Sequence, residues 1–517
     1  MTAARSTETT TRRHMHAFPA EARERSAGVL LHPTSLPGSY GIGDLGDEAI
    51  VFLDWAQSAG VRIWQVLPLN PTGFGASPYG CLSSFAGNGL LISPQRLLQD
   101  GLLESRDVAD VPRFSDDRVE YDRVTEYKLR LLRVSWQRFQ DGASDELRQA
   151  LDAFVQDPEQ QAWLPRYALF RALKDHAGGK PWWEWEPALA AADPDALERA
   201  REIHAEEIRF REYVQFLFFR QWHQLRESAH ARGIRIMGDI PIYVAHDSAD
   251  VWGHRELFLL DDHGHPTAVA GVPPDYFSIT GQRWGNPLYR WDVMRDTGYR
   301  WWVDRLRTNL RMADIVRLDH FRGFAAYWEV PASEETAVHG RWMPGPGVAL
   351  FETLRRELGD LPLVAEDLGF ITDDVHELRR AIGLPGMKIV QFGFGQDDSP
   401  HLPHRFECAT VAYTGTHDND TARGWFKTAP EVEQKRALAY LGCKDEHDVA
   451  WEMIRATYTS VADFAIVPAQ DILSLGTEAR MNTPGAADDN WAWRMKSAEL
   501  THDMAERLRE LGVITGR

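Results

Sequence analysis

Cysteine is scarce in this chain of 517 residues, which has three: Cys81, Cys408 and Cys443. They are odd in number, far apart and without a Cys-x-x-Cys pair. That pattern argues against a disulfide framework and against a cysteine zinc site. Thiols used so sparingly suit a reducing compartment, and we expect a cytoplasmic protein.

Basic residues are outnumbered, with 57 Lys and Arg against 76 Asp and Glu. No basic run is long enough to follow a phosphate backbone, so a nucleic acid partner is not expected. The chain also lacks an apolar run of about 18 residues, so no membrane span is expected. The first 25 residues lack the apolar segment of a secretory signal. We predict a disordered tail over residues 1–25, although its Arg, Ser and Thr content is faintly typical of a transit peptide.

What the chain does have is an alternation of short apolar runs with amphipathic segments, which is typical of a parallel α/β protein. Eight such runs are predicted strands, the number found in a (β/α)8 TIM barrel. We therefore predict a catalytic barrel over residues 26–517. The predicted strands are residues 28–36, 62–69, 234–244, 313–319, 361–367, 387–394, 410–416 and 462–468.

Two long insertions interrupt the predicted barrel. Residues 70–230 follow the second strand and are predicted to be mainly helical, because apolar residues such as Val124, Tyr127 and Leu131 recur at spacings of three and four. Residues 246–296 follow the third strand and are rich in Gly, Pro and aromatic residues. They predict an irregular loop, either a surface loop held by its aromatic residues or a flap over an active site. The chain ends soon after the eighth strand, so no C-terminal β-domain is expected.

Charged residues gather where the fourth predicted strand ends, in the segment from Ile315 to Gly323. Side chains alternate along a strand, so Arg317 and Asp319 point the same way. A cation beside a carboxylate lowers its pKa and keeps it ionised, which an anionic nucleophile requires. An ordinary ion pair at a strand end explains this pattern equally well.

Two other strand ends carry acids, with Glu366 and Asp367 after the fifth strand and His417 and Asp418 after the seventh. The carboxyl ends of barrel strands surround one mouth, so these acids are expected to converge with Asp319. Convergent carboxylates without a Cys or His cluster fit a hard-metal site or glycoside cleavage. The spacing of an EF-hand is absent, and each acid alone could instead cap the helix that follows it.

The segments at these three strand ends are residues 317–323, 365–369 and 415–420. In this order they closely resemble the signature segments of the 4-α-glucanotransferases. These enzymes, also called amylomaltases or disproportionating enzymes, belong to the α-amylase superfamily. The resemblance implies transfer of an α-1,4-glucan segment to the 4-hydroxyl of glucose or of a maltooligosaccharide, by a retaining double displacement. No cofactor is indicated. Relatives in the superfamily often bind calcium, but the sequence has no dedicated calcium loop, so no metal is expected. The resemblance runs from about Gly28 to the C-terminus and includes residues 31–37, 41–46, 77–79, 282–289 and 481–485.

The resemblance also implies roles for the three carboxylates. Asp319 matches the nucleophile that forms a covalent glycosyl intermediate, Glu366 the general acid/base, and Asp418 the carboxylate that stabilises the transition state. Glu366 must then hold a proton at neutral pH. A neighbouring carboxylate would raise its pKa, and the candidates are Asp367, Asp319 and Asp418.

Eight further positions match substrate-binding residues of the family. Tyr79 resembles a residue that stacks on the sugar, Trp284 a flap residue over the acceptor, and Phe392 a pocket wall, although aromatic residues also serve plain packing. The two histidines could contact the sugar or support its neighbours. The family pattern has Gln where Gly80 stands here, followed by Cys81, which leaves the sugar contacts near Tyr79 open. The eight positions are Ser77, Tyr79, Trp284, Arg317, His320, Phe392, His417 and Asn482.

The same three carboxylates serve transferases and hydrolases. A flap rich in aromatic residues favours transfer, because it keeps water from the intermediate. The alternative is an intracellular α-amylase-like hydrolase of maltooligosaccharides, and a more distant one is an inert glucan-binding protein. We expect a monomer or a weak homodimer.

Overall fold

The computed structural model describes residues 23–274, 278–486 and 488–517. Residues 1–22 of the predicted tail therefore lie outside the described residues. Arg23 donates a hydrogen bond to the carbonyl oxygen of Gly383 at 2.7 Å, and Arg25 donates to that of Ser460 at 3.2 Å. Residues 23–25 thus belong to the folded domain, which corrects the end of the predicted tail.

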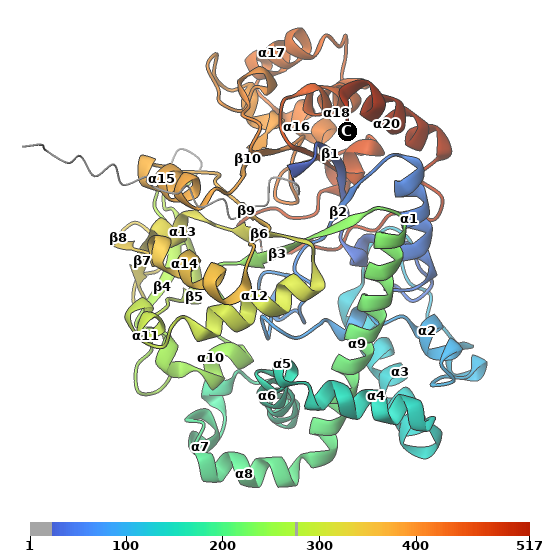
Figure 1. Cartoon of the computed structure of the whole chain (residues 1–517), viewed down its shortest axis with the longest axis vertical. Coiled ribbons are helices and arrows are strands. Elements are labelled where there is room, and N and C mark those ends of the chain that lie inside the picture. The colour runs from blue at the N-terminus through green and yellow to red at the C-terminus, as the bar shows by residue number, and fades with distance from the viewer. Residues whose placement is uncertain (1–22, 275–277, 487) are drawn as a thin grey trace, which may run out of the picture.

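Eight parallel strands form one sheet in the order β10-β11-β12-β1-β2-β3-β6-β9. The N–H of Ala365 donates to the carbonyl oxygen of Pro385 at 2.9 Å and joins the two ends of this order into a barrel. The predicted TIM barrel and all eight of its strands are confirmed (Figure 1). The strands are β1 (Ser26–Leu30), β2 (Ile63–Gln65), β3 (Arg235–Pro241), β6 (Ile315–Asp319), β9 (Leu363–Ala365), β10 (Gly386–Ile389), β11 (Thr410–Tyr413) and β12 (Phe464–Pro468).

The barrel strands are apolar because both of their faces are covered. Every residue of β1 and β12 is buried. A side chain at Gly28 would place its Cβ 2.9 Å from Cγ1 of Ile466, so glycine allows these two strands to pair closely. Helices pack around the outside: α1 (Asp47–Ser58), α12 (Arg300–Met312), α14 (Gly347–Leu358), α15 (Asp373–Ile382), α18 (Val449–Thr459) and α20 (His502–Thr515).

Helices fill the segment between β2 and β3, and Figure 1 shows them below the barrel. The predicted periodic positions Val124, Tyr127 and Leu131 are buried on one face of helix α3 (Tyr121–Gly142). These helices are α2 (Pro94–Gln99), α3 (Tyr121–Gly142), α4 (Asp145–Gln156), α5 (Pro158–Gln161), α6 (Leu164–His176), α7 (Pro187–Ala190), α8 (Pro194–Ile203) and α9 (Ala205–Ala231).

The segment after β3 is not the irregular loop that its composition predicts. It holds helices α10 (Ala249–Gly253) and α11 (Trp291–Asp296) and the antiparallel strands β4 (Ala268–Val272) and β5 (Gln282–Pro287). Strand β4 also pairs with β7 (Ala326–Pro331), which in turn pairs with β8 (Arg341–Pro344). The partners β7 and β8 follow β6, so this sheet joins two insertions that are separate in sequence. Residues 275–277 of the predicted flap lie outside the described residues.

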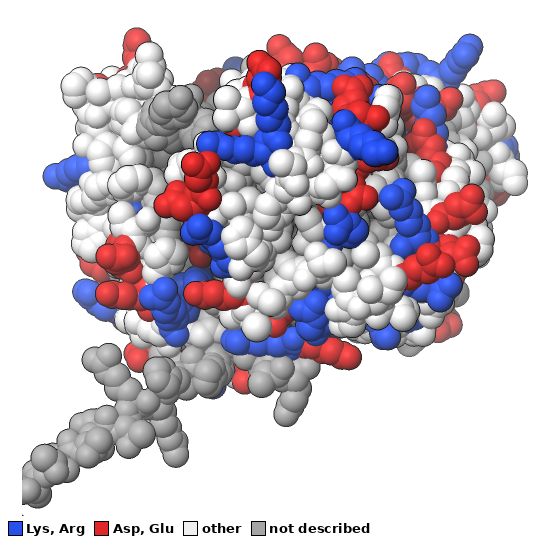
Figure 2. Space-filling view, turned by 90° about the horizontal axis from the view of Figure 1, so that it is seen from above, with Lys and Arg blue, Asp and Glu red and all other residues white. Residues whose placement is uncertain are grey.

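Short helices complete the connections near the strand ends: α13 (Arg322–Ala325), α16 (Ala422–Thr428), α17 (Glu431–Leu441) and α19 (Ala469–Ile472). Within the part of the chain that the structure describes, no helix has both the length and the apolar character needed to cross a membrane. On the face seen in Figure 2, acidic and basic side chains are interspersed and do not gather into a patch of one sign.

Candidate active site

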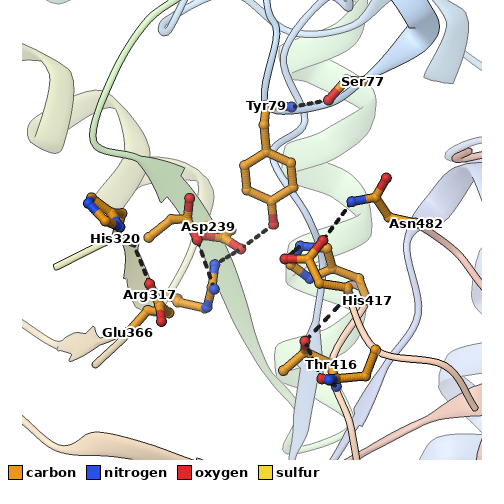
Figure 3. A network of polar contacts seen from close by, with 12 residues as sticks. Ser77, Tyr79, Asp239, Arg317, His320, Glu366, Thr416, His417 and Asn482 are labelled. Carbon is orange, nitrogen blue, oxygen red and sulfur yellow. Dashed lines mark hydrogen bonds and ion pairs between the residues drawn. The ribbon is translucent and has the colours of Figure 1, made fainter. Parts of the chain in front are cut away.

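A buried arginine at the end of β6 holds two carboxylates at once. Nη2 of Arg317 lies 2.8 Å from Oδ1 of Asp319, and its Nη1 lies 2.6 Å from Oδ2 of Asp239 on the adjacent strand β3 (Figure 3). Burial alone would lower the pKa of Arg317, but the two carboxylates outweigh it and raise that pKa. The guanidinium therefore stays charged and fixes the Asp319 carboxylate at the barrel mouth.

Asp239 is a site residue that the sequence reasoning missed. Besides pairing with Arg317, it accepts a hydrogen bond at 2.7 Å from the hydroxyl of Tyr79. Burial raises the pKa of Asp239 to about 6, although Arg317 pulls it the other way. The sequence did contain a signal for it: Asp239 is the acid within the mostly apolar strand β3, and a buried carboxylate needs a partner.

Replacing Asp239 with Asn is expected to lower kcat/KM on maltotriose about a hundredfold, since Arg317 would lose one of its two anchors and loosen Asp319. Steady-state kinetics measures the loss, and thermal unfolding shows whether the variant remains folded. Tyr79→Phe is the matched control. It removes the hydrogen bond to Asp239 but keeps both ion pairs, so its loss should be smaller. Equal activity of Asp239→Asn and wild type would contradict the anchoring role.

Glu366 is the buried acid at the end of β9. Its Oε2 accepts the N–H of His320 at 2.7 Å and its Oε1 accepts that of Leu368 at 2.8 Å. Burial and the charge of Asp319 raise the pKa of Glu366 to about 8, so it holds a proton at neutral pH. Asp367 is not the neighbour responsible. It accepts the N–H of Met387 and pairs with Arg379, on the side toward β10.

His320 takes an uncommon backbone conformation between these groups, with φ of +50°. A residue with a side chain rarely adopts such an angle, and strain of this kind gathers at functional sites. Burial lowers the pKa of His320 to about 4, while Asp319 opposes the shift, so the ring is neutral at neutral pH. The ring of Trp284, on β5, meets it edge to face at 4.7 Å. A neutral imidazole can donate to or accept from a sugar hydroxyl.

Asp418 lies across the mouth in the loop after β11. Its Oδ1 accepts from the Asn482 amide at 2.7 Å, and its Oδ2 lies 3.3 Å from Nε2 of His417. Burial would raise the pKa of Asp418, but His417 and Asn482 bring it below its usual range, so the carboxylate stays charged. The Tyr79 ring stacks on His417 with centroids 5.1 Å apart, which links this side to Asp239.

Two of the predicted binding residues lie at the margin of this network. The hydroxyl oxygen of Ser77 accepts the N–H of Tyr79 at 3.2 Å and so shapes the turn that carries the ring. Phe392, after β10, is 44% exposed, and its ring contacts His401 edge to face rather than a group of the carboxylate network. The structure thus brings the other predicted residues together and leaves Phe392 apart.

None of the three carboxylates caps the helix that follows it. Helix α16 is capped by the side chain of Thr421, and α15 and α13 begin after Thr372 and Phe321, which make no side-chain cap. A barrel mouth that holds an arginine-paired carboxylate, a protonated carboxyl and a third charged carboxylate has the arrangement expected of an enzyme that acts on glycosidic bonds.

Comparison with known proteins narrows this class. A family model described as 4-alpha-glucanotransferase matches residues 31–501. The 4-alpha-glucanotransferase of Thermus thermophilus is 49% identical over 502 residues, which cover 95% of this chain and 99% of that protein. That of Synechocystis is 46% identical over 498 residues, covering 96% and 98%. The chain therefore belongs to the 4-alpha-glucanotransferase family and is an enzyme of this type, as its motifs predict.

A solved structure agrees with this assignment. The amylomaltase of Streptococcus agalactiae, in complex with acarbose, superposes with a TM-score of 0.92 at 38% identity. The match covers 96% of this chain and 100% of that one. The barrel and its insertions are thus those of an amylomaltase.

Proposed function

We propose that this chain transfers segments of α-1,4-glucans by a double displacement through a covalent intermediate on Asp319. A carboxylate oxygen of Asp319 attacks the anomeric carbon while Glu366 gives its proton to the departing 4-oxygen, and the glycosidic bond breaks. The acceptor 4-hydroxyl then gives its proton to Glu366 and attacks the same carbon, and the bond to Asp319 breaks. Asp418 binds sugar hydroxyls and stabilises the positive charge of the transition state.

The observation that carries this proposal is the pair of unlike carboxyl groups. Arg317 pairs with Asp319 at 2.8 Å, while burial and the nearby charge of Asp319 raise the pKa of Glu366 and keep it protonated. A nucleophile and a general acid need these opposite states at the same pH. The remaining predicted residues would bind the sugar: His320, His417 and Asn482 through polar atoms, and Tyr79, Trp284 and Phe392 through their rings.

Transfer rather than hydrolysis requires that an acceptor reach the intermediate before water does. Trp284 on β5 is 38% exposed and contacts His320, which supports our proposal that it covers the acceptor. We infer that residues 246–296 act as the flap and that the helical insertion of residues 70–230 forms a wall of the mouth.

Incubation with maltotriose tests the proposal. The transferase should yield glucose together with maltopentaose and longer products, because a maltosyl unit on Asp319 passes to a second maltotriose. Chromatography of the products over the first tenth of the reaction measures this. An α-amylase-like hydrolase would give shorter products alone, and that outcome would remove the transferase proposal.

The acceptors we propose are glucose and maltooligosaccharides, and large α-1,4-glucans serve as donors. We propose that the enzyme works as a monomer or a weak homodimer. The three cysteines are free thiols, which supports the cytoplasm as the site of action.

A further inference from the structure

Phe370 and Trp342 form an aromatic surface that the proposed mechanism does not use. Phe370 is 59% exposed, and its ring stacks on that of Trp342 with centroids 6.3 Å apart and an angle of 19° between planes. Phe370 lies in the loop that follows β9 and carries Glu366, whereas Trp342 lies on β8. Figure 1 shows β8 next to α13 and α15.

Arg322 joins these two rings to the catalytic turn. Its Cζ lies 3.9 Å from the centre of the Trp342 ring and 5.7 Å from that of Phe370. Its Nη1 donates to the hydroxyl of Thr372 at 3.1 Å, and the side chain is buried. Arg322 stands three residues after Asp319. The aromatic platform made of Arg322, Trp342 and Phe370 is therefore fixed relative to the nucleophile.

The platform and Trp284 are connected through one sheet and one catalytic turn. The four-stranded sheet carries Trp284 on one edge strand, β5, and Trp342 on the other, β8. Trp284 contacts His320 and Trp342 contacts Arg322, so both tryptophans reach one short turn. If Trp284 covers the acceptor next to the cleavage point, the platform lies farther along the acceptor chain.

The exposed Phe370 ring is available to a ligand. Its stacking on Trp342 and the cation of Arg322 beneath both rings hold this apolar face in a fixed position. Within the described residues, four aromatic side chains are classed as exposed: Trp284, Phe370, Phe392 and Tyr440. Two rings offer much less than the roughly 800 Å² that each partner buries in a stable protein interface. A sugar ring, whose C–H face packs flat on an aromatic ring, fits this size.

We propose that the aromatic platform binds a glucose ring of the acceptor glucan beyond the cleavage point and so favours long acceptors. This inference rests on the proposed function and names the acceptor class of the same site. Short acceptors such as glucose do not reach the platform, whereas a maltohexaose acceptor does. Acceptor length is thus selected by Phe370 and Trp342, at a distance from the reacting atoms.

The test is a kinetic comparison of two acceptors with one donor, α-maltosyl fluoride blocked at its terminal 4-hydroxyl so that it cannot serve as acceptor. Phe370→Ala and Trp342→Ala should lower kcat/KM for maltohexaose about tenfold, the equivalent of one ring contact, and that for glucose less than about twofold. Phe370→Tyr should restore the wild-type preference. Tyr440→Ala, which removes an exposed ring on α17, is the matched control and should change neither value.

Equal losses for glucose and maltohexaose would overturn the platform, because they would mean that the rings merely support Arg322 and the loop of Glu366. Unchanged values for both acceptors would overturn it too. Should Trp342→Ala fail to fold, the exposed Phe370→Ala still decides. Calorimetry of maltohexaose on Asp319→Asn, with and without Phe370→Ala, separates the two proposals: weaker binding supports the platform even if no transfer product forms, and unchanged affinity contradicts it.

Discussion

Asp319→Asn is expected to lower kcat on maltotriose by at least about 10⁴-fold. The amide has nearly the same shape as the carboxylate but carries no charge and forms no stable bond to the anomeric carbon. Arg317 keeps its ion pair with Asp239 at 2.6 Å, so the buried guanidinium is not left without a carboxylate. The variant should therefore fold and bind glucans while it fails to turn them over.

Product chromatography measures the loss, and thermal unfolding with calorimetry on maltohexaose checks folding and binding. Asp54→Asn is a matched control, since Asp54 also pairs with an arginine, Arg232 at 2.7 Å, but on the outer helix α1. Its activity should equal that of wild type. Near-normal turnover by Asp319→Asn would mean that another group forms the intermediate and that the Arg317–Asp319 pair is structural.

The barrel was predictable from the sequence because its strands are buried on both faces. Each then appears as a short apolar run, and the polar residues that follow mark the mouth. The pairing of Arg317 with Asp319 was also predictable, since side chains two apart on a strand share a face. The need for a proton on Glu366 came from the resemblance to the glucanotransferases, and a neighbouring carboxylate was the expected cause of its raised pKa.

Asp239 shows what the sequence could not supply. Its place in the site depends on the register between β3 and β6, which sets Asp239 directly beside Arg317 although 78 residues separate them. The sequence of β3 alone does not show which residue pairs with Asp239.

The four-stranded sheet was missed for a related reason. Strands β4 and β5 are short, each contains a Gly, β5 is largely polar, and the other partner of β4, strand β7, comes from the insertion after β6.

The left-handed conformation of His320 is a third such feature. It turns the backbone so that the N–H of His320 points at Glu366, a contact between residues 46 apart. A histidine in the sequence does not indicate a positive φ angle, whereas a glycine at such a position would have suggested one. Strand ends, therefore, were predictable, and the contacts between them were not.

Glu366→Gln is expected to lower kcat on maltotriose by about 10²- to 10⁴-fold, because glutamine cannot give a proton to the departing 4-oxygen. The amide oxygen of glutamine can still accept a hydrogen bond from the N–H of Leu368 or of His320, so the loop should keep its conformation. Maltosyl fluoride separates the two steps, since fluoride leaves without a proton. The variant should then form the intermediate but break it down slowly, and mass spectrometry should find a maltosyl adduct on Asp319. Absence of the adduct, with normal turnover of the fluoride, would contradict both assigned roles.

The pH dependence of the wild-type enzyme follows from the same side chain. Glu366 acts as an acid when protonated, and its pKa is raised to about 8 by burial and by Asp319. When the first step limits the rate, kcat should be constant below pH 8 and should fall about tenfold per pH unit above it. Once Asp319 is esterified its charge is gone, one cause of the raised pKa disappears, and Glu366 becomes the base that the second step needs. Glu366→Gln should lose the alkaline limb, and a limb that persists in that variant would assign the titration to another group.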